Sequence, residues 1–361
     1  MRTAAILSEA WRNTTTRTTR ATMFALTLGL AVAATSLLDT TTTISIQQRA
    51  DEWNASGAAI HVLSADQGID GRSCATLTDA RGDTSQPITS TGALTAGPAL
   101  TFDATPASSL PTFTVTPSLA GVLGIETPAT DGAWISDQLA DTLAAATGDH
   151  LDSDRGPLTI AGVFPWPDDG RDQRIAYALL VPSATQTRYD ECWATITPSN
   201  PAALDLLRTA GIVTPQSTTA APIALVNNTL GQDFDAWAQY DSRTSRHTAL
   251  LIPLLGLALG YVATRLRRLE YASALHAGVG RRAQYLTAGM ETLAWVVPAT
   301  AAAAAVIALT ASRLTDPANA VDLLAGQLPA LTAAIVTSQL GVLAALTLTQ
   351  ERHLFAYFKE R

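Results

Sequence analysis

The chain has 361 residues, of which 15% are charged and 47% are hydrophobic, and its formal net charge is −8. This much apolar side-chain surface excludes an intrinsically disordered chain, and an acidic chain lacks the basic face with which nucleic-acid-binding proteins neutralise phosphates. The length allows about two domains, and the uneven placement of the charges argues against a simple soluble enzyme.

Residues 1–20 are basic, with four arginines and one glutamate, and we predict a cytoplasmic amphipathic helix within them. Ile6, Leu7, Ala10 and Trp11 fall on one face of such a helix. Tryptophan and arginine both suit the interface between a membrane and water. A flexible basic segment is the alternative.

Long stretches with almost no charge predict membrane-spanning helices, because a helix needs about 20 apolar residues to cross a bilayer. We expect transmembrane helices at 21–38, 248–264, 286–312 and 323–350. A secretory signal peptide is the alternative for the first stretch, although its apolar core is longer than the usual length of about 7–15 residues. Burial inside a large protein is the alternative for the other three.

Basic residues indicate the orientation, because arginine and lysine collect on the cytoplasmic side of a membrane. They are in excess in the N-terminal residues 1–20, in the connection 265–285 and in the tail 351–361. These segments lie on one side if all four helices span, so we expect a multi-pass protein of the cytoplasmic membrane. The opposite side then holds residues 39–247, whose net charge is −14 from 10 Arg and 24 Asp plus Glu.

The outer segment 39–247 is predicted to be an α+β domain carried on two stalks. Residues 40–53 are expected to prolong the first membrane helix, and residues 231–247 to form the returning stalk. The aromatic residues expected on one stripe of that stalk are Phe234, Trp237 and Tyr240.

Local patterns predict the elements between the stalks. Turn-forming residues dominate 64–112, where we expect short strands and loops, and β-rich apolar runs predict strands at 113–115, 158–164 and 176–181. Helical spacing predicts a helix over 135–146, capped by Ser136, and another over 202–211, closed by Gly211.

Both cysteines, Cys74 and Cys192, lie in the outer segment. A cysteine pair in an oxidising compartment suggests a disulfide, and closing so long a loop stabilises a protein by up to about 4 to 5 kcal/mol in the chain-entropy model. Two buried free thiols are the alternative.

The connection between the second and third membrane helices, residues 265–285, reads RLRRLEYASALHAGVGRRAQY. We expect a helix over 270–277 that ends at Gly278, and a second, basic helix that begins at Arg281. Taken alone, the arginines need do no more than set the orientation and reach lipid phosphates.

This segment resembles the cytoplasmic coupling region of MacB/FtsX-type (type VII) ABC transporter permeases. The family pattern is a basic pair, a Glu, a helix, a Gly and a second basic pair. Its residues here are Arg267, Arg268, Glu270, Gly278, Arg281 and Arg282. The family's order of an amphipathic helix, one span, an outer domain and three further spans is also similar. Residues 116–149 and 158–164 loosely resemble the family's periplasmic core domain, whereas 52–112 show no match.

The resemblance implies a permease subunit whose coupling helix, Glu270–Gly278, docks on a separate ABC ATPase. The residues it assigns to ATPase coupling are Arg267, Arg268, Glu270, Tyr271, Leu275, Gly278, Arg281 and Arg282. ATP and Mg would be bound by the ATPase, and this chain is expected to hold no cofactor. The implied partners are that ATPase, a second permease chain in a homo- or heterodimer, and membrane lipid, with no nucleic acid.

The resemblance further implies that ATP-driven movement reaches the outer domain, which expels a peptide, lipoprotein or drug. An FtsX-like regulator of a cell-wall hydrolase or signalling partner is the alternative function. A membrane-anchored binding protein without an ATPase partner is a third possibility.

Motifs for other chemistries are missing from the sequence. It contains no G-x-x-x-x-G-K-[ST] for ATP, no G-x-S-x-G for hydrolysis, and no histidine spacing typical of metal sites. The acidic pairs Asp152/Asp154 and Asp168/Asp169 are expected to be solvated turns. Glu291 lies at the boundary of the third membrane helix, where an ionisable residue can be functional but more often reaches the interface.

Overall fold

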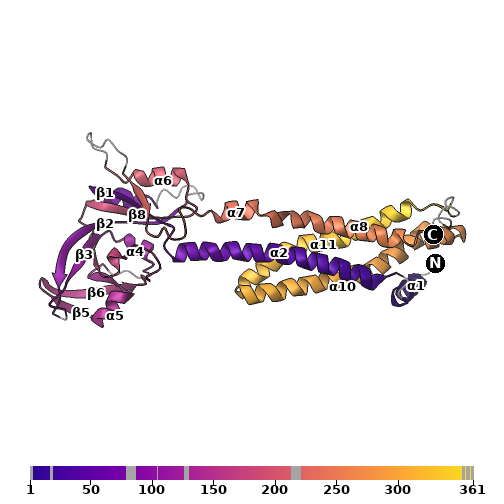
Figure 1. Ribbon diagram of the computed structural model, residues 1–361, viewed down its shortest axis with the longest axis horizontal. Helices are drawn as coiled ribbons and strands as arrows, with labels where there is room; N and C mark the ends of the chain where they lie inside the picture. Colours follow the sequence, from indigo (N-terminus) through magenta and orange to yellow (C-terminus); the bar gives the residue numbers. More distant parts are fainter. Residues whose placement is uncertain are drawn as a thin grey trace. The chain divides into compact units, whose positions relative to one another are not determined.

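The computed structural model describes residues 3–16, 19–78, 87–103, 105–125, 130–212, 221–351, 354 and 358, and for residues 3–7 and 11 it describes the backbone alone. Contacts divide the chain into two compact units, which Figure 1 shows as a helical part and a part rich in strands. The helical unit comprises Met1–Gln47 and Ala238–Arg361, and the sheet unit comprises Gln48–Trp237. Each unit has a hydrophobic core of its own.

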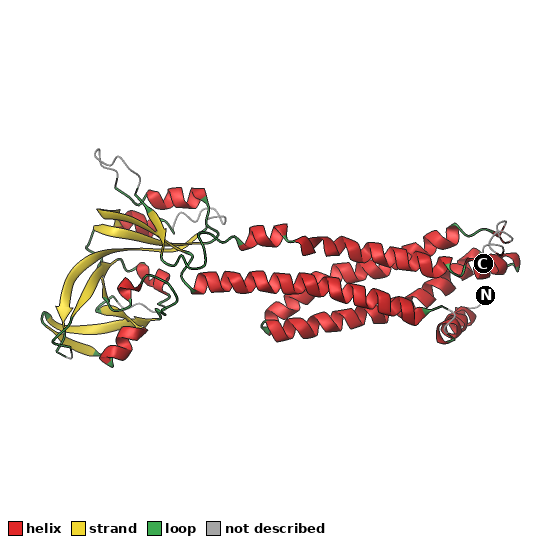
Figure 2. Cartoon of the chain, viewed as in Figure 1, coloured by secondary structure: helices red, strands yellow, loops and turns green. Residues whose placement is uncertain are grey.

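Four helical segments of the described chain are long and apolar enough to cross a membrane. They are α2 Ala21–Ala55, the segment formed by η2 Thr244–His247 and α8 Thr248–Arg265, α10 Arg281–Leu314 and α11 Pro317–Thr347. Shorter helices are α1 Thr3–Thr15, α7 Ala236–Ser242 and α9 Arg268–His276. The bundle of α2, α8, α10 and α11 is seen in Figure 2.

Apolar residues four apart along α2 form the core of the bundle, because that spacing places them on one helical face. Phe24 and Leu28 of α2 lie in one buried cluster with Ile252 of α8, Trp295 of α10 and Leu331 of α11. The ring centroids of Phe24 and Trp295 are 5.7 Å apart. Each of the four long helices therefore contributes to the same core.

Helices α8 and α11 approach each other closely through glycines. A Cβ atom at Gly260 would lie 2.1 Å from the Ser338 carbonyl oxygen, and one at Gly341 would lie 2.2 Å from the Leu257 carbonyl oxygen. Small residues at such crossings allow backbones to touch, which is the usual way in which membrane helices associate. The close approach therefore depends on the absence of side chains at these positions.

The prediction for the first stalk is confirmed, and the prediction for the second is wrong. Helix α2 continues without interruption to Ala55, so the prediction that 40–53 prolong the first helix is confirmed. The prediction of one aromatic stripe on the returning segment is wrong, because α7 begins only at Ala236. Phe234 precedes that helix and stacks on the buried Trp53 with centroids 5.8 Å apart, whereas Trp237 is 74% exposed.

The sheet unit is a mixed sheet of nine described strands in the order β5-β6-β4-β7-β3-β2-β8-β1-β9. Pairs β3–β7 and β4–β6 are parallel, and the other major pairs are antiparallel. The strands are β1 Ile60–Asp70, β2 Ile88–Thr101, β3 Ser109–Val115, β4 Ala133–Ser136, β5 His150–Ser153, β6 Gly156–Phe164, β7 Leu179–Pro182, β8 Arg188–Ile196 and β9 Ile223–Leu225. The helices are α3 Gly71–Thr76, α4 Leu119–Leu123, α5 Asp137–Leu143, η1 Gln173–Ile175 and α6 Pro201–Arg208.

The expectation of short strands over 64–112 is wrong. Strands β1 and β2 have 11 and 14 residues. Several of their turn-forming residues, among them Asp66, Gly68 and Pro98, lie at irregularities inside the strands, where the pairing register shifts between Ser64 and Ile69 and between Gly97 and Leu100. A bulge accommodates such residues without ending the strand.

Other local predictions are confirmed in part. Strands are present at 113–115 and 158–164, and Ser136 caps α5 by accepting a hydrogen bond from the Leu139 amide at 3.0 Å. Helix α5 is shorter than predicted, since its first predicted residues pair in β4 and Ala144 is left-handed. Strand β7 begins at Leu179 rather than at residue 176, because η1 and a turn precede it. Helix α6 ends at Arg208, and Gly211 forms a β-bridge instead.

The predicted disulfide between Cys74 and Cys192 is present. It joins α3 to β8, which lies between β2 and β1 in the sheet, with Cα atoms 6.0 Å apart. Both cysteines are fully buried in a cluster that includes Leu63, Ile69 and Tyr189. The free-thiol alternative is therefore wrong.

Candidate functional site

The connection between α8 and α10 consists of α9 Arg268–His276 and a short turn on each side of it. The helix predicted over 270–277 is present, and the chain turns after it at Gly278, whose φ is +82°. The Gly278 amide donates to the Leu275 carbonyl at 3.0 Å, and the Val279 amide donates to the Ala274 carbonyl at 2.9 Å. This bonding satisfies the carbonyls at the end of the helix and favours glycine at the left-handed position.

Arg267, the residue before α9, is the centre of a polar cluster. Its Nε atom donates to the Glu270 carboxylate at 2.7 Å, and its Nη1 atom donates to the Glu291 carboxylate. Its guanidinium also lies over the Tyr271 ring, 5.3 Å from the centroid. The Arg267 side chain is only 13% exposed and that of Glu291 only 5%, so the contact between these two is shielded from solvent.

Glu291 joins three elements of the helical unit. Its side chain lies on α10, is 5% exposed and accepts from Arg267. Its other carboxylate oxygen accepts from the Asn13 side chain of α1 at 2.6 Å. The carboxylate therefore joins α1, the α8–α9 turn and α10.

Tyr271 fixes α9 against the bundle. Its ring is buried with Ala288 of α10 and with Val342 and Leu346 of α11. Its backbone carbonyl accepts from the side chain of Gln284 at 2.9 Å. Helix α9 is thus held against α10 and α11 by packing and by one buried hydrogen bond.

The surroundings of Tyr271 and Arg267 hold each of these two side chains in one charge state. Burial raises the pKa of Tyr271 above its ordinary value, so the hydroxyl stays protonated at neutral pH. Burial alone would lower the pKa of Arg267, but the neighbouring Tyr271, Glu291 and Glu270 raise it, and the net shift is upward. The arginine therefore remains charged beside its carboxylates.

The predicted coupling residues divide into three groups by their exposure to solvent. Arg267 and Tyr271 point inward, and Arg268 and Leu275 are half-buried. Glu270, Gly278, Arg281 and Arg282 are exposed, with the Glu270 side chain 59% exposed. The structure brings Arg267, Glu270 and Tyr271 into contact, whereas the pair Arg281 and Arg282 forms the exposed start of α10.

A pocket of about 220 Å³ opens beside the cluster. Its lining comes from α1, α9, α10 and the residues that flank α9, and comprises Glu9, Asn13, Arg267, Glu270, Tyr271, Ala274, Val279, Ala283, Gln284, Thr287 and Glu291. No group of three or more His, Cys, Asp or Glu in the described part of the chain is placed to hold a metal ion. The arrangement offers an exposed, charged helix on an internal anchor.

Two residues of the cluster were not among the predicted coupling residues. The sequence offered a reason to suspect Glu291, since an acidic residue inside a predicted membrane helix can be functional. The sequence offered no comparable reason to suspect Asn13, because its partner Glu291 lies 278 positions away. The predicted face of α1 depends on the side chains of Ile6, Leu7 and Trp11, which lie outside the described part, as do the basic tail residues Arg352, Lys359 and Arg361.

No protein-family model and no curated protein matches the chain. Among solved structures, it is similar to the periplasmic region of MacB from Actinobacillus actinomycetemcomitans, with 13% identity, 46% of this chain and 88% of that chain covered, and a TM-score of 0.32. It is also similar to the extracellular domain of the ABC-type transporter YknZ from Gram-positive bacteria, with 11% identity, 46% and 99% covered, and a TM-score of 0.30. At these values the likenesses establish no shared activity.

Proposed function

We propose that the chain is the permease subunit of an ABC transporter, in which a separate ATPase drives movement of the sheet unit. One observation carries the proposal: the segment that resembles a coupling region is a short helix with an exposed charged edge, anchored on the buried Arg267–Glu291 ion pair. A helix that only oriented the chain in a membrane would need the surface arginines but not this internal anchor.

The exposed and buried groups have separate roles in this proposal. Glu270, Arg281 and Arg282 offer charges to the docking ATPase. Arg267 passes displacement of α9 to α10 and α1 through Glu291, because a hydrogen-bonded buried ion pair is costly to break. Docking therefore moves several elements together rather than bending one loop.

In this proposal the protein lies in the cytoplasmic membrane with four spans, and the sheet unit, inserted between the first and second spans, lies on the extracytoplasmic side. Two permease chains, alike or different, pair within the lipid. ATP and Mg are bound by the ATPase, since this sequence contains no P-loop motif. The proposed cargo class is a peptide, lipoprotein or drug.

The test is co-purification from gently solubilised membranes. The tagged wild-type chain is expected to bring an ABC ATPase with it, and the Glu270→Arg variant is expected to lose that ATPase. Asp205→Arg is the matched control, because Asp205 is 74% exposed on the sheet unit and its reversal changes the net charge equally. Absence of an ATPase from the wild-type sample contradicts the proposed function, and equal retention in both variants contradicts the assignment of Glu270.

A further inference from the structure

The end of α2 is capped by residues that are distant in the sequence. The chain turns at Gly57, whose φ is +72°, and the amides of Gly57 and Ala58 donate to the carbonyls of Asn54 and Trp53 at 3.2 Å and 3.1 Å. This local motif leaves the next two carbonyls without a partner from the helix itself. Within the sheet unit, two side chains supply the missing donors.

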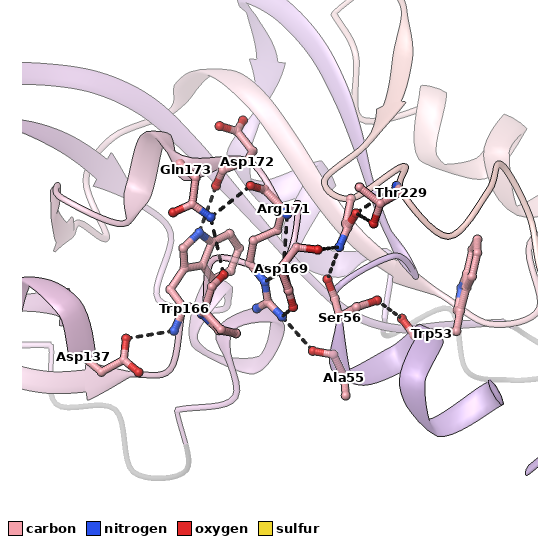
Figure 3. Close-up of polar contacts among 12 residues, drawn as sticks. Trp53, Ala55, Ser56, Asp137, Trp166, Asp169, Arg171, Asp172, Gln173 and Thr229 are labelled. Carbon is pink, nitrogen blue, oxygen red and sulfur yellow. Dashed lines mark hydrogen bonds and ion pairs between the residues drawn. The ribbon is translucent and has the colours of Figure 1, made fainter. Parts of the chain in front are cut away.

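Arg171 and Asn227 provide these donors, as Figure 3 shows for Arg171 and its surroundings. The Nη2 atom of Arg171 donates to the Ala55 carbonyl at 2.8 Å, and the side-chain amide of Asn227 donates to the Ser56 carbonyl at 3.1 Å. The Asn227 residue is fully buried, and Arg171 is 7% exposed. A cation at this position also complements the negative end of the helix dipole.

Arg171 is in turn fixed to the body of the sheet unit. Its Nε and Nη2 atoms donate to the two oxygens of Asp169 at 2.9 Å and 2.7 Å, and its guanidinium lies 4.8 Å from the centroid of the Trp166 ring. The hydrogen bonds from Arg171 hold the pKa of Asp169 below its ordinary value, so the pair stays charged at neutral pH. Trp166 belongs to the main hydrophobic core, where its ring lies 6.1 Å from that of Trp193.

The returning chain meets the same end of α2. Phe234 stacks on Trp53 in the last turns of the helix, with centroids 5.8 Å apart, and the Arg49 guanidinium lies 5.9 Å from the Phe234 ring centroid. Trp53 is 4% exposed. The outgoing and returning segments of the sheet unit are therefore joined where Arg171 caps the helix.

We infer that Arg171 is a positioning residue for force transmission, which fixes the carbonyl end of α2 to the core of the sheet unit so that displacement of α2 moves the sheet as one body. The inference rests on the proposed function. It predicts that loss of Arg171 separates ATP hydrolysis from movement of the sheet, without removing either the ATPase or the fold.

The test uses the full chain, alone and with its co-purified ATPase, in lipid nanodiscs. Spin labels are attached to cysteines introduced at Asp51 on α2 and Asp205 on α6, both exposed. The native cysteines are bonded to each other and buried, so the introduced ones are labelled selectively. The distance distribution between the labels is measured without nucleotide and with ATP and vanadate.

In wild type we expect one narrow distribution that nucleotide leaves unchanged. In Arg171→Gln we expect a broader distribution that shifts with nucleotide, while the ATPase turns over at the wild-type rate. Arg174→Gln is the matched control, because Arg174 binds Asp172 and Glu191 within the sheet unit, and its distribution is expected to match wild type. Arg171→Lys, which keeps the charge but has one donor centre in place of the guanidinium fork, is expected to be intermediate.

An Arg171→Gln distribution identical to wild type overturns the inference, whether or not an ATPase is bound. If that variant fails to fold, Asp169→Asn takes its place, since it loosens Arg171 without removing the donor to Ala55. If no ATPase co-purifies with wild type, the proposed function and the transmission role are both overturned. This failure is distinguishable from failure of the Arg171 contact itself, because the distance distribution of the wild-type chain alone would still be narrow.

Discussion

The carboxylate of Asp39, on α2, accepts a hydrogen bond from the guanidinium of Arg243, with Nε 3.0 Å from Oδ1. The two side chains are 12% and 13% exposed. Ser245 donates to the same oxygen at 2.7 Å, and Gln327 of α11 donates to the other oxygen at 3.0 Å. One carboxylate thus binds the outgoing helix to the segment that returns before α8 and to α11.

We predict that Asp39→Ala destabilises the helical unit by about 3 kcal/mol, because it leaves a largely buried arginine without its carboxylate. The exchange Asp39→Arg with Arg243→Asp is expected to recover part of this loss. Asp241→Ala is the control, since its carboxylate is 88% exposed and lies 3.8 Å from Arg246, and we expect a change within about 0.5 kcal/mol. Unfolding of the full chain in mixed micelles with increasing SDS measures all three, and equal losses at Asp39 and Asp241 would contradict the prediction.

Gly260→Ala is expected to weaken the contact between α8 and α11 by about 1 to 3 kcal/mol, as overpacking does in tight interiors. The new Cβ would lie 2.1 Å from the Ser338 carbonyl oxygen, which is backbone and has little room to yield. Gly326→Ala on α11 is the matched control, because apart from the neighbouring backbone of α11 no described atom lies within 4 Å of its Cβ position. The control is expected to be neutral or stabilising through helix propensity. A normal SDS midpoint for Gly260→Ala would show that the helices pack differently.

Gly278→Val is expected to leave membrane insertion intact and to abolish ATPase activity linked to this chain. Gly278 has a φ of +82° with open space around it. Valine is therefore unfavourable there because of the left-handed backbone conformation and not because of a steric clash, and the strain distorts the end of α9. Gly280→Val provides the comparison, since Gly280 has a φ of −63° and equally open surroundings. Stimulation of the co-purified ATPase by each variant is the measurement, and full stimulation by Gly278→Val would exclude a strict requirement for this turn.

The sheet unit is expected to lose stability as the pH falls below about 6.5, the ordinary pKa of histidine. His61 is 4% exposed between the Ala59 carbonyl at 3.1 Å and the Ser199 hydroxyl at 3.2 Å, and burial lowers its pKa. Above this pH His61 is neutral in both the folded and the unfolded chain, so it contributes no pH dependence to the stability. Below it the unfolded chain binds the proton first, so stability falls by at most about 1.4 kcal/mol per pH unit until the folded-state pKa is reached.

Chemical denaturation of the full chain, followed by tryptophan fluorescence at about pH 7.5 and about pH 5.5, measures this effect, and His61→Asn is expected to flatten it. Asp70 and Asp169 do not interfere in this window. Hydrogen bonds from Ser73 and Arg171 lower the pKa values of these carboxyl groups below their ordinary 3.8, so their contribution is lost only in stronger acid. An unchanged slope in His61→Asn would assign the pH dependence to other groups.

Replacing Cys74 and Cys192 together by alanine is expected to cost the sheet unit about 2 to 5 kcal/mol. Because both sulfurs are fully buried, the native protein is expected to resist reductant and alkylating reagent until it is denatured. Mass spectrometry after alkylation, with and without prior unfolding, checks this. Rapid modification of the native protein by reductant and alkylator would contradict the burial.

The sequence by itself determined the features that depend on neighbouring residues. Uncharged stretches predict the long helices of the bundle, Ser136 predicts its own cap, and Gly278 predicts the end of α9. These features could be predicted because hydrophobic length, capping hydrogen bonds and a left-handed turn are decided within a few residues. The cysteine pair could be proposed for a different reason, since only one intramolecular pairing exists for two cysteines.

Only the tertiary structure decided which distant groups meet. It pairs Glu291 with Asn13 across 278 positions and brings Arg171 to the Ala55 carbonyl across 116. It also extends β1 and β2 through turn-forming residues, where the pairing register shifts between Ser64 and Ile69 and between Gly97 and Leu100. A local pattern cannot specify such contacts, because the free energy of a buried ion pair or a strand pairing depends on partners that only the folded chain brings within hydrogen-bonding distance.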